Sequence, residues 1–190
     1  MPTSIKYDAR LLATVALAVS TGETRYYLKG VMIEGRKAVA TNGHLMTVAT
    51  DDGELTENNP SDAAIMPVSK KAITAMKNRK AEYVEFKDGT LTVWSGQNDN
   101  LYMEPSHAID GTFPDWESVL PKTGSEVSHG AFESDLLLTV AHGAKILGYG
   151  SGVVSVSFHG EDDSSPHLAK YHNIRCDIFT VLMPLLKRPS

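Results

Sequence analysis

Basic side chains crowd between positions 70 and 80 of the chain: Lys70, Lys71, Lys77, Arg79 and Lys80. Lysine and arginine neutralise phosphate oxygens, and such contacts hold nucleic acid without reading its sequence. Ala72, Ile73 and Met76 stand between them at helical spacing, which predicts a helix with one apolar and one basic face. The segment therefore indicates contact with nucleic acid, and a solvated surface helix is the alternative.

Two other places carry residue types that can do chemistry. His44 lies in a turn without a carboxylate or nucleophile beside it in sequence, so a structural role is expected. Metal-ligand types also gather at His159, Glu161, Asp162, Asp163 and His167. Their spacing matches no standard metal site, and no P-loop, GxSxG, HExxH or dinucleotide-binding glycine motif is present. We expect no catalytic residue, no cofactor and no metal, and a small enzyme built on His44 or on this loop is the weakest alternative.

Composition limits the classes of protein that remain. The 190 residues and 20.6 kDa suffice for one large or two small domains. The apolar run Leu11–Val19 is too short to span a membrane and follows no basic region, so a buried helix is expected there. The single cysteine, Cys176, excludes an internal disulfide and favours the cytoplasm. A net charge of −5 disfavours bulk attraction to nucleic acid, but it allows a ring that is acidic outside and basic inside.

One order of elements recurs three times: a strand, a helix and then three strands. The first copy is expected as a strand at Ser4–Tyr7, a helix from Asp8 to about Ser20, and strands at Tyr26–Glu34, Lys37–Thr41 and His44–Thr50. Tight bends separate the last three, and Asn42-Gly43 is the pair that most readily supplies two positive φ angles. The acidic stretch Asp51–Asp62, which contains Pro60, is expected to be a linker.

The second and third copies follow the same order. The second is expected as a strand at Ala63–Val68, a helix from its cap Ser69 to about Asn78, and strands at Tyr83–Lys87, Thr90–Ser95 and Asn100–Glu104. An irregular connector, Pro105–Thr123, follows. The third is expected as a strand at Val127–Phe132, a helix from its cap Ser134 to Leu147 with Gly148 just after it, and strands at Val153–His159, Leu168–His172 and Cys176–Leu186. The order predicts an α+β protein built of three β-α-βββ half-units.

Three passages resemble, in the same order, passages of the sliding clamps of bacterial replicative DNA polymerases, the polymerase III beta subunits. They are RYYLKG…TNGHLMTVA at 25–49, FPDW with VLP at 113–121, and VLMPL at 181–185. The chain departs from the family in having no counterpart of its first domain or of the first half of its last domain. Asn42 stands where the family usually has Asp, Leu45 where it usually has Arg, and Leu186 replaces a basic residue.

The resemblance implies the DNA-clamp fold in one and a half clamp domains. Residues 1–120 would form one domain of two half-units, about 1–55 and 62–105, plus a linker, and residues 121–190 would form a third half-unit. The chain is then expected to be a truncated, phage-encoded or mobile-element protein of DNA replication. Because the family's ring contains twelve half-units, four chains of three would close a ring as a homotetramer with alternating chain directions.

The resemblance also implies partners and sites. The expected partners are duplex DNA without sequence preference, copies of the chain itself, and a DNA polymerase or other clamp-binding peptides, with no membrane. The implied DNA-binding residues are Lys70, Lys71, Lys77, Arg79, Lys80, Arg10 and Lys145. The implied peptide pocket comprises Leu28, Thr41, Gly43, His44, Leu45, Met46, Pro114, Val119, Val181, Leu182, Met183 and Pro184. Plain core packing is the alternative for the pocket, and a clamp mimic that binds host clamp machinery without encircling DNA is the alternative function.

Overall fold

The first part of the molecule is a strand, a helix and a three-stranded meander. The computed structural model describes residues 4–22, 25–57, 59–97, 99–121, 132–148, 154–162, 165–174 and 176–185. What we call the first unit consists of β1 (Ile5–Asp8), α1 (Ala9–Ala16), the 3-10 turn η1 (Tyr26–Leu28), β2 (Gly30–Glu34), β3 (Lys37–Thr41) and β4 (Leu45–Thr50). Asp8 caps α1, because its carboxylate accepts from the N–H groups of Arg10 and Leu11 at 2.8 and 2.9 Å.

Two expectations for the first unit were wrong in detail. The helix ends at Ala16 and not near Ser20, because the next N–H groups bond to carbonyls three residues back, as in a 3-10 turn. The strand expected from Tyr26 begins only at Gly30, since the preceding residues wind into η1 and bury Leu28. A side chain at Gly30 would lie 2.8 Å from the Ile65 side chain, so β2 can start there only with glycine.

The second unit repeats this order after a linker that contains the 3-10 turn η2 (Glu54–Thr56). It consists of β5 (Ala64–Pro67), α2 (Lys70–Met76), β6 (Ala81–Lys87), β7 (Thr90–Ser95) and β8 (Asn100–Pro105). Ser69 caps α2 through a bond from the Ala72 N–H, as the sequence predicts. The β6–β7 turn has positive φ at both Asp88 and Gly89, which is the geometry expected of an Asp-Gly pair.

The third unit consists of α3 (Ser134–Leu147), β9 (Ser155–His159), β10 (His167–His172) and β11 (Asp177–Leu182), and a connector with the 3-10 turn η3 (Glu117–Val119) leads to it. The strand expected at Val127–Phe132 lies outside the described residues apart from Phe132. The cap of α3 is Glu133, without a side-chain bond, and not Ser134. Gly148 closes α3 in a right-handed conformation (φ −74°), so it is not the left-handed glycine that was expected. β11 ends at Leu182, before the Pro184 that lacks an N–H.

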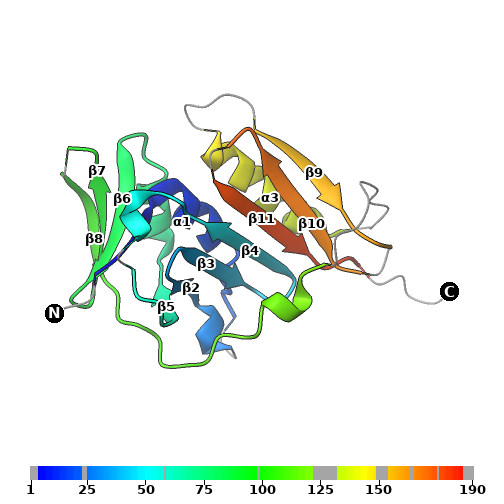
Figure 1. Ribbon diagram of the computed structural model, residues 1–190, viewed down its shortest axis with the longest axis horizontal. Coiled ribbons are helices and arrows are strands. Elements are labelled where there is room, and N and C mark those ends of the chain that lie inside the picture. Colours follow the sequence, from blue (N-terminus) through cyan, green and yellow to red (C-terminus); the bar gives the residue numbers. More distant parts are fainter. Residues whose placement is uncertain are drawn as a thin grey trace.

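The strands form two antiparallel sheets that exchange their first strands between units. One sheet has the order β1-β6-β7-β8, and the other has the order β5-β2-β3-β4-β11-β10-β9. Thus β1 of the first unit pairs with β6 of the second, and β5 of the second pairs with β2 of the first. The predicted α+β class is confirmed by these two sheets and their helices (Figure 1). The division into domains 1–120 and 121–190 stays a prediction.

The seven-stranded sheet separates two apolar layers. Its inner face and the inner face of the other sheet pack on the three helices, with buried residues that include Tyr7, Leu12 and Met76. Its outer face carries a smaller cluster of Met32, Val39, Met46, Val48 and Val181, against which the connector packs. Alternate residues of β2 and β3 enter the two layers, as the period of a strand requires. No described helix is long and apolar enough to cross a membrane.

Candidate functional site

The turn between β3 and β4 is locked by its own side chains. Asn42 Oδ1 accepts from the N–H groups of His44 and Leu45, both at 2.9 Å, and Thr41 Oγ1 donates to the Leu45 carbonyl at 2.9 Å. Only Gly43 has a positive φ, of 92°, so the expectation that Asn42 also would was wrong. Asn42 acts through its side chain, which closes the turn onto the backbone beyond it. The result is a rigid rim with His44 exposed on it.

The end of β11 runs along this turn. β11 pairs with β4 so that Val181 lies opposite Met46 and Leu182 opposite Leu45. The pairing continues one step further, because the Met183 N–H donates to the His44 carbonyl at 3.0 Å. Residues that lie about 140 positions apart along the chain therefore form one continuous apolar edge.

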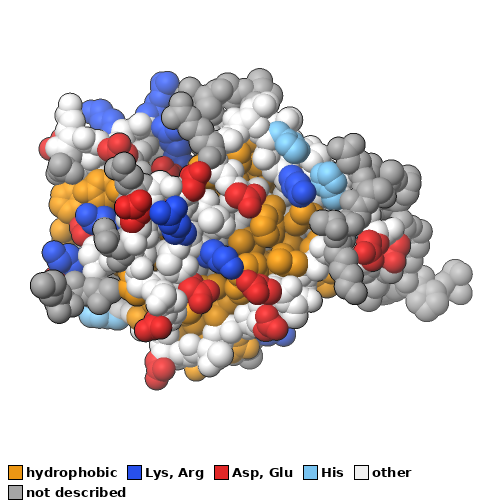
Figure 2. Space-filling view, in the orientation of Figure 1, with side chains coloured by type: hydrophobic (Ala, Val, Ile, Leu, Met, Phe, Trp, Pro, Cys, Tyr) orange, Lys and Arg blue, Asp and Glu red, His pale blue; other side chains and the backbone are white. Residues whose placement is uncertain are grey.

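The connector brings a third wall to the same place. Phe113, Trp116 and Leu120 pack on the outer cluster of the seven-stranded sheet. Lys37 Nζ lies 5.2 Å from the centre of the Trp116 ring and 3.2 Å from Glu117 Oε1, so the connector is also held from β3. Figure 2 shows apolar side chains gathered over the middle strands of this sheet, on the side where the connector crosses it.

These three walls enclose an apolar hollow of about 200 Å³, which we call the connector pocket. Of the residues implied by the sequence, it is lined by Leu28, Thr41, Gly43, His44, Leu45, Met46, Pro114, Val119, Val181 and Met183. Val119 and Met183 form its exposed rim, with 45% and 42% of their surfaces accessible. Leu182 and Pro184 do not line it, and Leu182 instead packs fully buried in the inner core.

Three residues of the connector pocket were not predicted from the sequence: Arg25, Asp115 and Trp116. Trp116 and Asp115 stand inside the FPDW passage, so that motif was the available signal. Arg25 is the first residue of the RYYLKG passage, so that motif was the signal for it, and its Nη1 lies near Gly43 of the turn. The pocket thus combines apolar walls with one positive and one negative side chain that could orient a ligand.

The helices bring basic side chains together on the inner side of the molecule. Arg10 of α1, Lys77 at the end of α2, and Lys145 of α3 line one hollow of about 290 Å³, together with His142 and Ile146. A neighbouring hollow of about 630 Å³ between α1 and α2 includes Lys29, Lys70 and Lys77. We call the two hollows the basic helical face. Lys71, Arg79 and Lys80 are exposed but line neither hollow.

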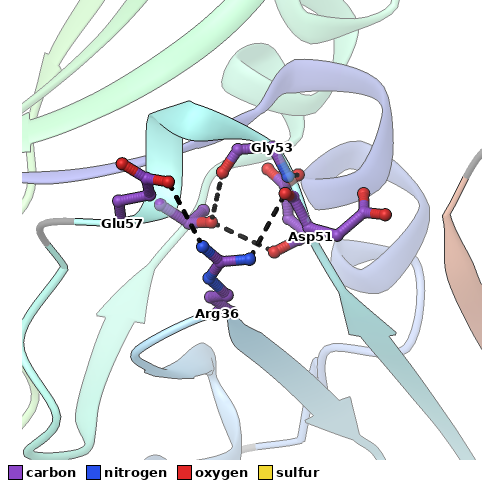
Figure 3. Close-up of polar contacts among 6 residues, drawn as sticks. Arg36, Asp51, Gly53 and Glu57 are labelled. Atoms are coloured by element: carbon purple, nitrogen blue, oxygen red, sulfur yellow. Dashed lines mark hydrogen bonds and ion pairs between the residues drawn. The ribbon is translucent and has the colours of Figure 1, made fainter.

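A further hollow, of about 690 Å³, lies at the linker between the first two units and is a structural junction. There the Thr56 hydroxyl bonds to the carbonyls of Asp51 and Gly53, and Arg36 lies 3.6 Å from Glu57 (Figure 3). Burial, and then the charges of Asp8, Asp51 and Asp52, raises the pKa of the nearby Cys176 thiol to about 11. Because a thiol with so high a pKa is not a thiolate at neutral pH, this corner offers no nucleophile.

The described histidines of the 159–167 loop bond within their own segment. His167 is fully buried and its Nδ1 bonds to the Ser165 carbonyl at 2.9 Å, while His159 turns back to Ser157 at 2.8 Å. Within the described ranges, no group of three or more His, Cys, Asp or Glu side chains could hold a metal ion. Asp163 of this loop lies outside the described residues.

Comparisons with known proteins agree on one family. The beta sliding clamp of Pseudomonas aeruginosa is 28% identical over 127 residues, which are 62% of this chain and 33% of that protein. The beta sliding clamp of Escherichia coli K12 is 30% identical over 122 residues, 60% of this chain and 31% of that protein. This chain is similar in sequence to the beta sliding clamps. It spans about a third of the length of these relatives, and no protein-family model matches it.

The fold leads to the same family. A crystal structure of the Caulobacter crescentus beta sliding clamp superposes with a TM-score of 0.69 and 22% identity, covering 97% of this chain and 65% of that one. The DNA polymerase sliding clamp of Pseudomonas aeruginosa superposes with a TM-score of 0.68 and 18% identity, covering 97% and 67%. The chain therefore has the sliding-clamp fold. The predicted resemblance to the beta sliding clamps is confirmed, whereas the roles of individual residues in the clamp sites stay predictions.

Proposed function

We propose that this chain is a non-enzymatic DNA-replication protein that assembles with copies of itself into a ring around duplex DNA and tethers a partner protein in the connector pocket. The observation that carries the DNA contact is the meeting of Arg10, Lys77 and Lys145 at one hollow. These residues come from three helices far apart in sequence, and the fold places them on one side of the molecule. Cations that converge in this way suit a phosphate backbone, which offers a charge at regular intervals.

The distribution of charge supports the same proposal. The whole chain carries a net charge of −5, yet α1 and α2 contain no acidic residue between their first and last positions. The acidic residues of α3 are confined to its first turn and its cap, Asp135 and Glu133, and Lys145 stands in its last turn. A surface that is basic where the helices lie and acidic elsewhere attracts DNA locally while the molecule stays soluble.

Retention on circular DNA tests the ring. The chain would be loaded on a nicked circle and on the same DNA made linear, and the bound fraction followed over time after dilution. We expect slow loss from the circle and rapid loss from the linear form, because a ring leaves DNA only by opening or by sliding off an end. Equal rates of loss from the two forms would contradict encirclement.

Charge reversal on the basic helical face tests which surface touches the DNA. Lys70→Glu with Lys71→Glu and Lys77→Glu should abolish retention, and Lys145→Glu alone should weaken it. Each removed phosphate contact is expected to reduce the slope of log affinity against log salt by about 0.9. Lys87→Glu and Lys170→Glu change exposed lysines of β6 and β10, away from the helices, and serve as matched controls. Unchanged retention in the triple variant would contradict the assignment of α2 to the channel.

The connector pocket is proposed to bind a short apolar peptide of a polymerase or another clamp-binding partner. Its volume of about 200 Å³ accommodates one or two large apolar side chains, and Arg25 and Asp115 can orient the peptide backbone. Val119→Asp or Met183→Asp should weaken the capture of a labelled clamp-binding peptide at least about tenfold, because each puts a charge into a rim that the bound peptide would remove from water. Met103→Asp, at a methionine of β8 that is 56% exposed, is the control.

A clamp mimic is the second candidate, favoured by the net charge of −5 and by the presence of the connector pocket. Such a protein would occupy clamp-binding peptides, or host clamp machinery, without encircling DNA. It predicts full peptide capture together with no retention on circular DNA. The proposed site of action is the cytoplasm, and a phage origin of the chain stays a prediction.

A further inference from the structure

In this fold, the first two units complete one hydrophobic core together. Each donates its first strand to the other, so that β1 pairs with β6 and β5 pairs with β2, and α1 and α2 pack between the sheets. The exchange is reciprocal and therefore has the character of a two-fold axis. It buries the apolar surface that either unit would expose alone.

The described part of the third unit is a helix and three strands, and no other described unit closes its far side. Among the described residues, β9 pairs only with β10, so its second edge carries unpaired backbone groups. One flank of α3 packs on α1, where a side chain on Gly143 would lie 3.0 Å from Thr14. On the far flank stand Leu137, Ala141 and Ala144, spaced four and then three positions apart. Leu137 is 40% exposed and its neighbour Leu138 is 53% exposed.

We propose that a second copy of this chain covers this flank of α3 and the open edge of β9 across a two-fold axis, so that two third units complete each other. The inference extends the proposed self-assembly by naming one of its two kinds of contact. We place this axis perpendicular to α3, so that the two α3 helices run antiparallel. The acidic first turn of each, with Glu133 and Asp135, then lies beside the basic last turn of the other, with Lys145.

The charges of β9 fit the same occupant. The strand reads Ser155, Val156, Ser157, Phe158 and His159, without a lysine, an aspartate or a glutamate. Edge strands that must stay unpaired usually carry such charges as a protection against pairing. The edge at β9 lacks that protection, and its seven-stranded sheet can extend by pairing with a strand of the second copy.

Solution mass is the first test, because a monomer would leave this flank of α3 uncovered. The native chain is expected at two or four times its mass of 20.6 kDa at tens of micromolar. Leu137→Glu should halve that mass, while Tyr26→Glu, at a 55% exposed aromatic residue of η1, should leave it unchanged. Circular dichroism would confirm that the variants are folded. A native monomer, or an unchanged mass of Leu137→Glu, would overturn the inference.

Cross-linking tests the geometry without depending on weakened association. Ala141 is exposed near the middle of α3, so in an antiparallel pair it meets its own copy, whereas Ser134 at the helix start does not. In a Cys176→Ser background, mild oxidation should link Ala141→Cys into covalent dimers and leave Ser134→Cys largely monomeric. Equal linking of both variants would contradict the two-fold arrangement.

The outcome can be separated from that of the proposed function. Met103→Glu would disturb β8, at the free edge of the other sheet, and should leave the α3 contact and the Ala141→Cys cross-link intact. An intact dimer that is not retained on circular DNA would count against the ring and leave this inference standing. Retention on circular DNA by a protein whose mass does not respond to Leu137→Glu would do the reverse.

Discussion

The first two units and the described part of the third unit share a helix followed by three strands but reach very different degrees of closure. Seven of the eight residues of α1 are buried, against five of the fourteen residues of α3. The difference comes from neighbours, because α1 lies between α2 and α3 while α3 has α1 on one flank alone among the described elements (Figure 1). A β-α-βββ unit therefore supplies secondary structure by itself, but its core depends on a second unit.

The largest test of this comparison is a pair of equal truncations in the two helices. Leu12→Ala in α1 should lower the free energy of unfolding by about 4 kcal/mol, and Leu136→Ala in α3 by about 2 kcal/mol. Leu12 is fully buried, whereas Leu136, in the same core, keeps 7% of its surface exposed. Urea unfolding followed by circular dichroism measures both. Equal losses would show that α3 is as enclosed as α1.

The seam between the two regions is tested by Gly143→Ala. The added methyl group would lie 2.9 Å from the Tyr171 hydroxyl and 3.0 Å from Thr14 of α1. Alanine favours a helix by about 1 kcal/mol over glycine. We nevertheless expect Gly143→Ala to lower the free energy of unfolding by about 2 kcal/mol, because crowding at the seam outweighs that gain. Ala141→Gly, on the exposed side of the same helix, should cost about 1 kcal/mol through propensity alone. A gain in stability for Gly143→Ala would mean that the Tyr171 and Thr14 side chains can move away from the added methyl group.

Much of this architecture can be predicted from sequence, because the signals are local. The strands Lys37–Thr41 and Thr90–Ser95 lie where alternation and turn residues place them, and Ser69 caps its helix as expected. The exchange of β1 and β5 between units cannot be predicted in this way. The choice of partner depends on which surfaces meet in three dimensions, and no local pattern encodes that.

In the candidate sites, too, some residues can be predicted from local sequence signals and others are brought together only by the fold. Gly43 and His44 belong to a motif that can be recognised along the chain, and the fold brings them to the connector pocket. Arg25 also belongs to a quoted passage, RYYLKG, but the passage alone does not show that its side chain turns toward Gly43 and the pocket. Arg10, Lys77 and Lys145 meet at one hollow, while Arg79 and Lys80 do not join them although they lie next to Lys77 in sequence. Whether peptide and DNA bind at these places is decided by the experiments proposed above.

A smaller effect concerns the start of α1, where the two closed units meet. Burial, and then the nearby Asp51 charge, raises the pKa of Asp8 above its ordinary value, although bonds from the Leu11 and Arg10 N–H groups oppose this. Because the folded-state pKa is the higher one, the folded protein binds the proton more tightly, so ionisation of Asp8 costs stability as pH rises through that pKa. Asp8→Asn keeps the cap and removes this cost.

The cap and the charge can be separated with two variants. Asp8→Asn should be more stable than Asp8→Ala by about 1 kcal/mol at every pH, because asparagine caps a helix as well as aspartate does. Relative to the native chain, Asp8→Asn should gain stability as the pH is raised from acid toward neutral and gain nothing in strong acid. Urea unfolding over that range measures it, and a pH-independent difference from the native chain would contradict the role of burial.

The smallest effects are expected at two exposed ion pairs, one at the linker between the first two units and one at the connector. Arg36 and Glu57 approach to 3.6 Å at the linker, and Lys37 and Glu117 to 3.2 Å at the connector, with about half of each side chain exposed. Glu57→Gln and Glu117→Gln should each cost about 0.5 kcal/mol or less, since exposed pairs are screened by water and salt. Lys37→Gln should cost about 1 kcal/mol, because it also removes the contact of the ammonium group with the Trp116 ring. High salt should abolish the cost of the two glutamate variants and leave much of the cost of Lys37→Gln. If all three variants respond alike to salt, the contact of Lys37 with the Trp116 ring contributes nothing to holding the connector. The connector, which forms one wall of the connector pocket, would then depend on apolar packing alone.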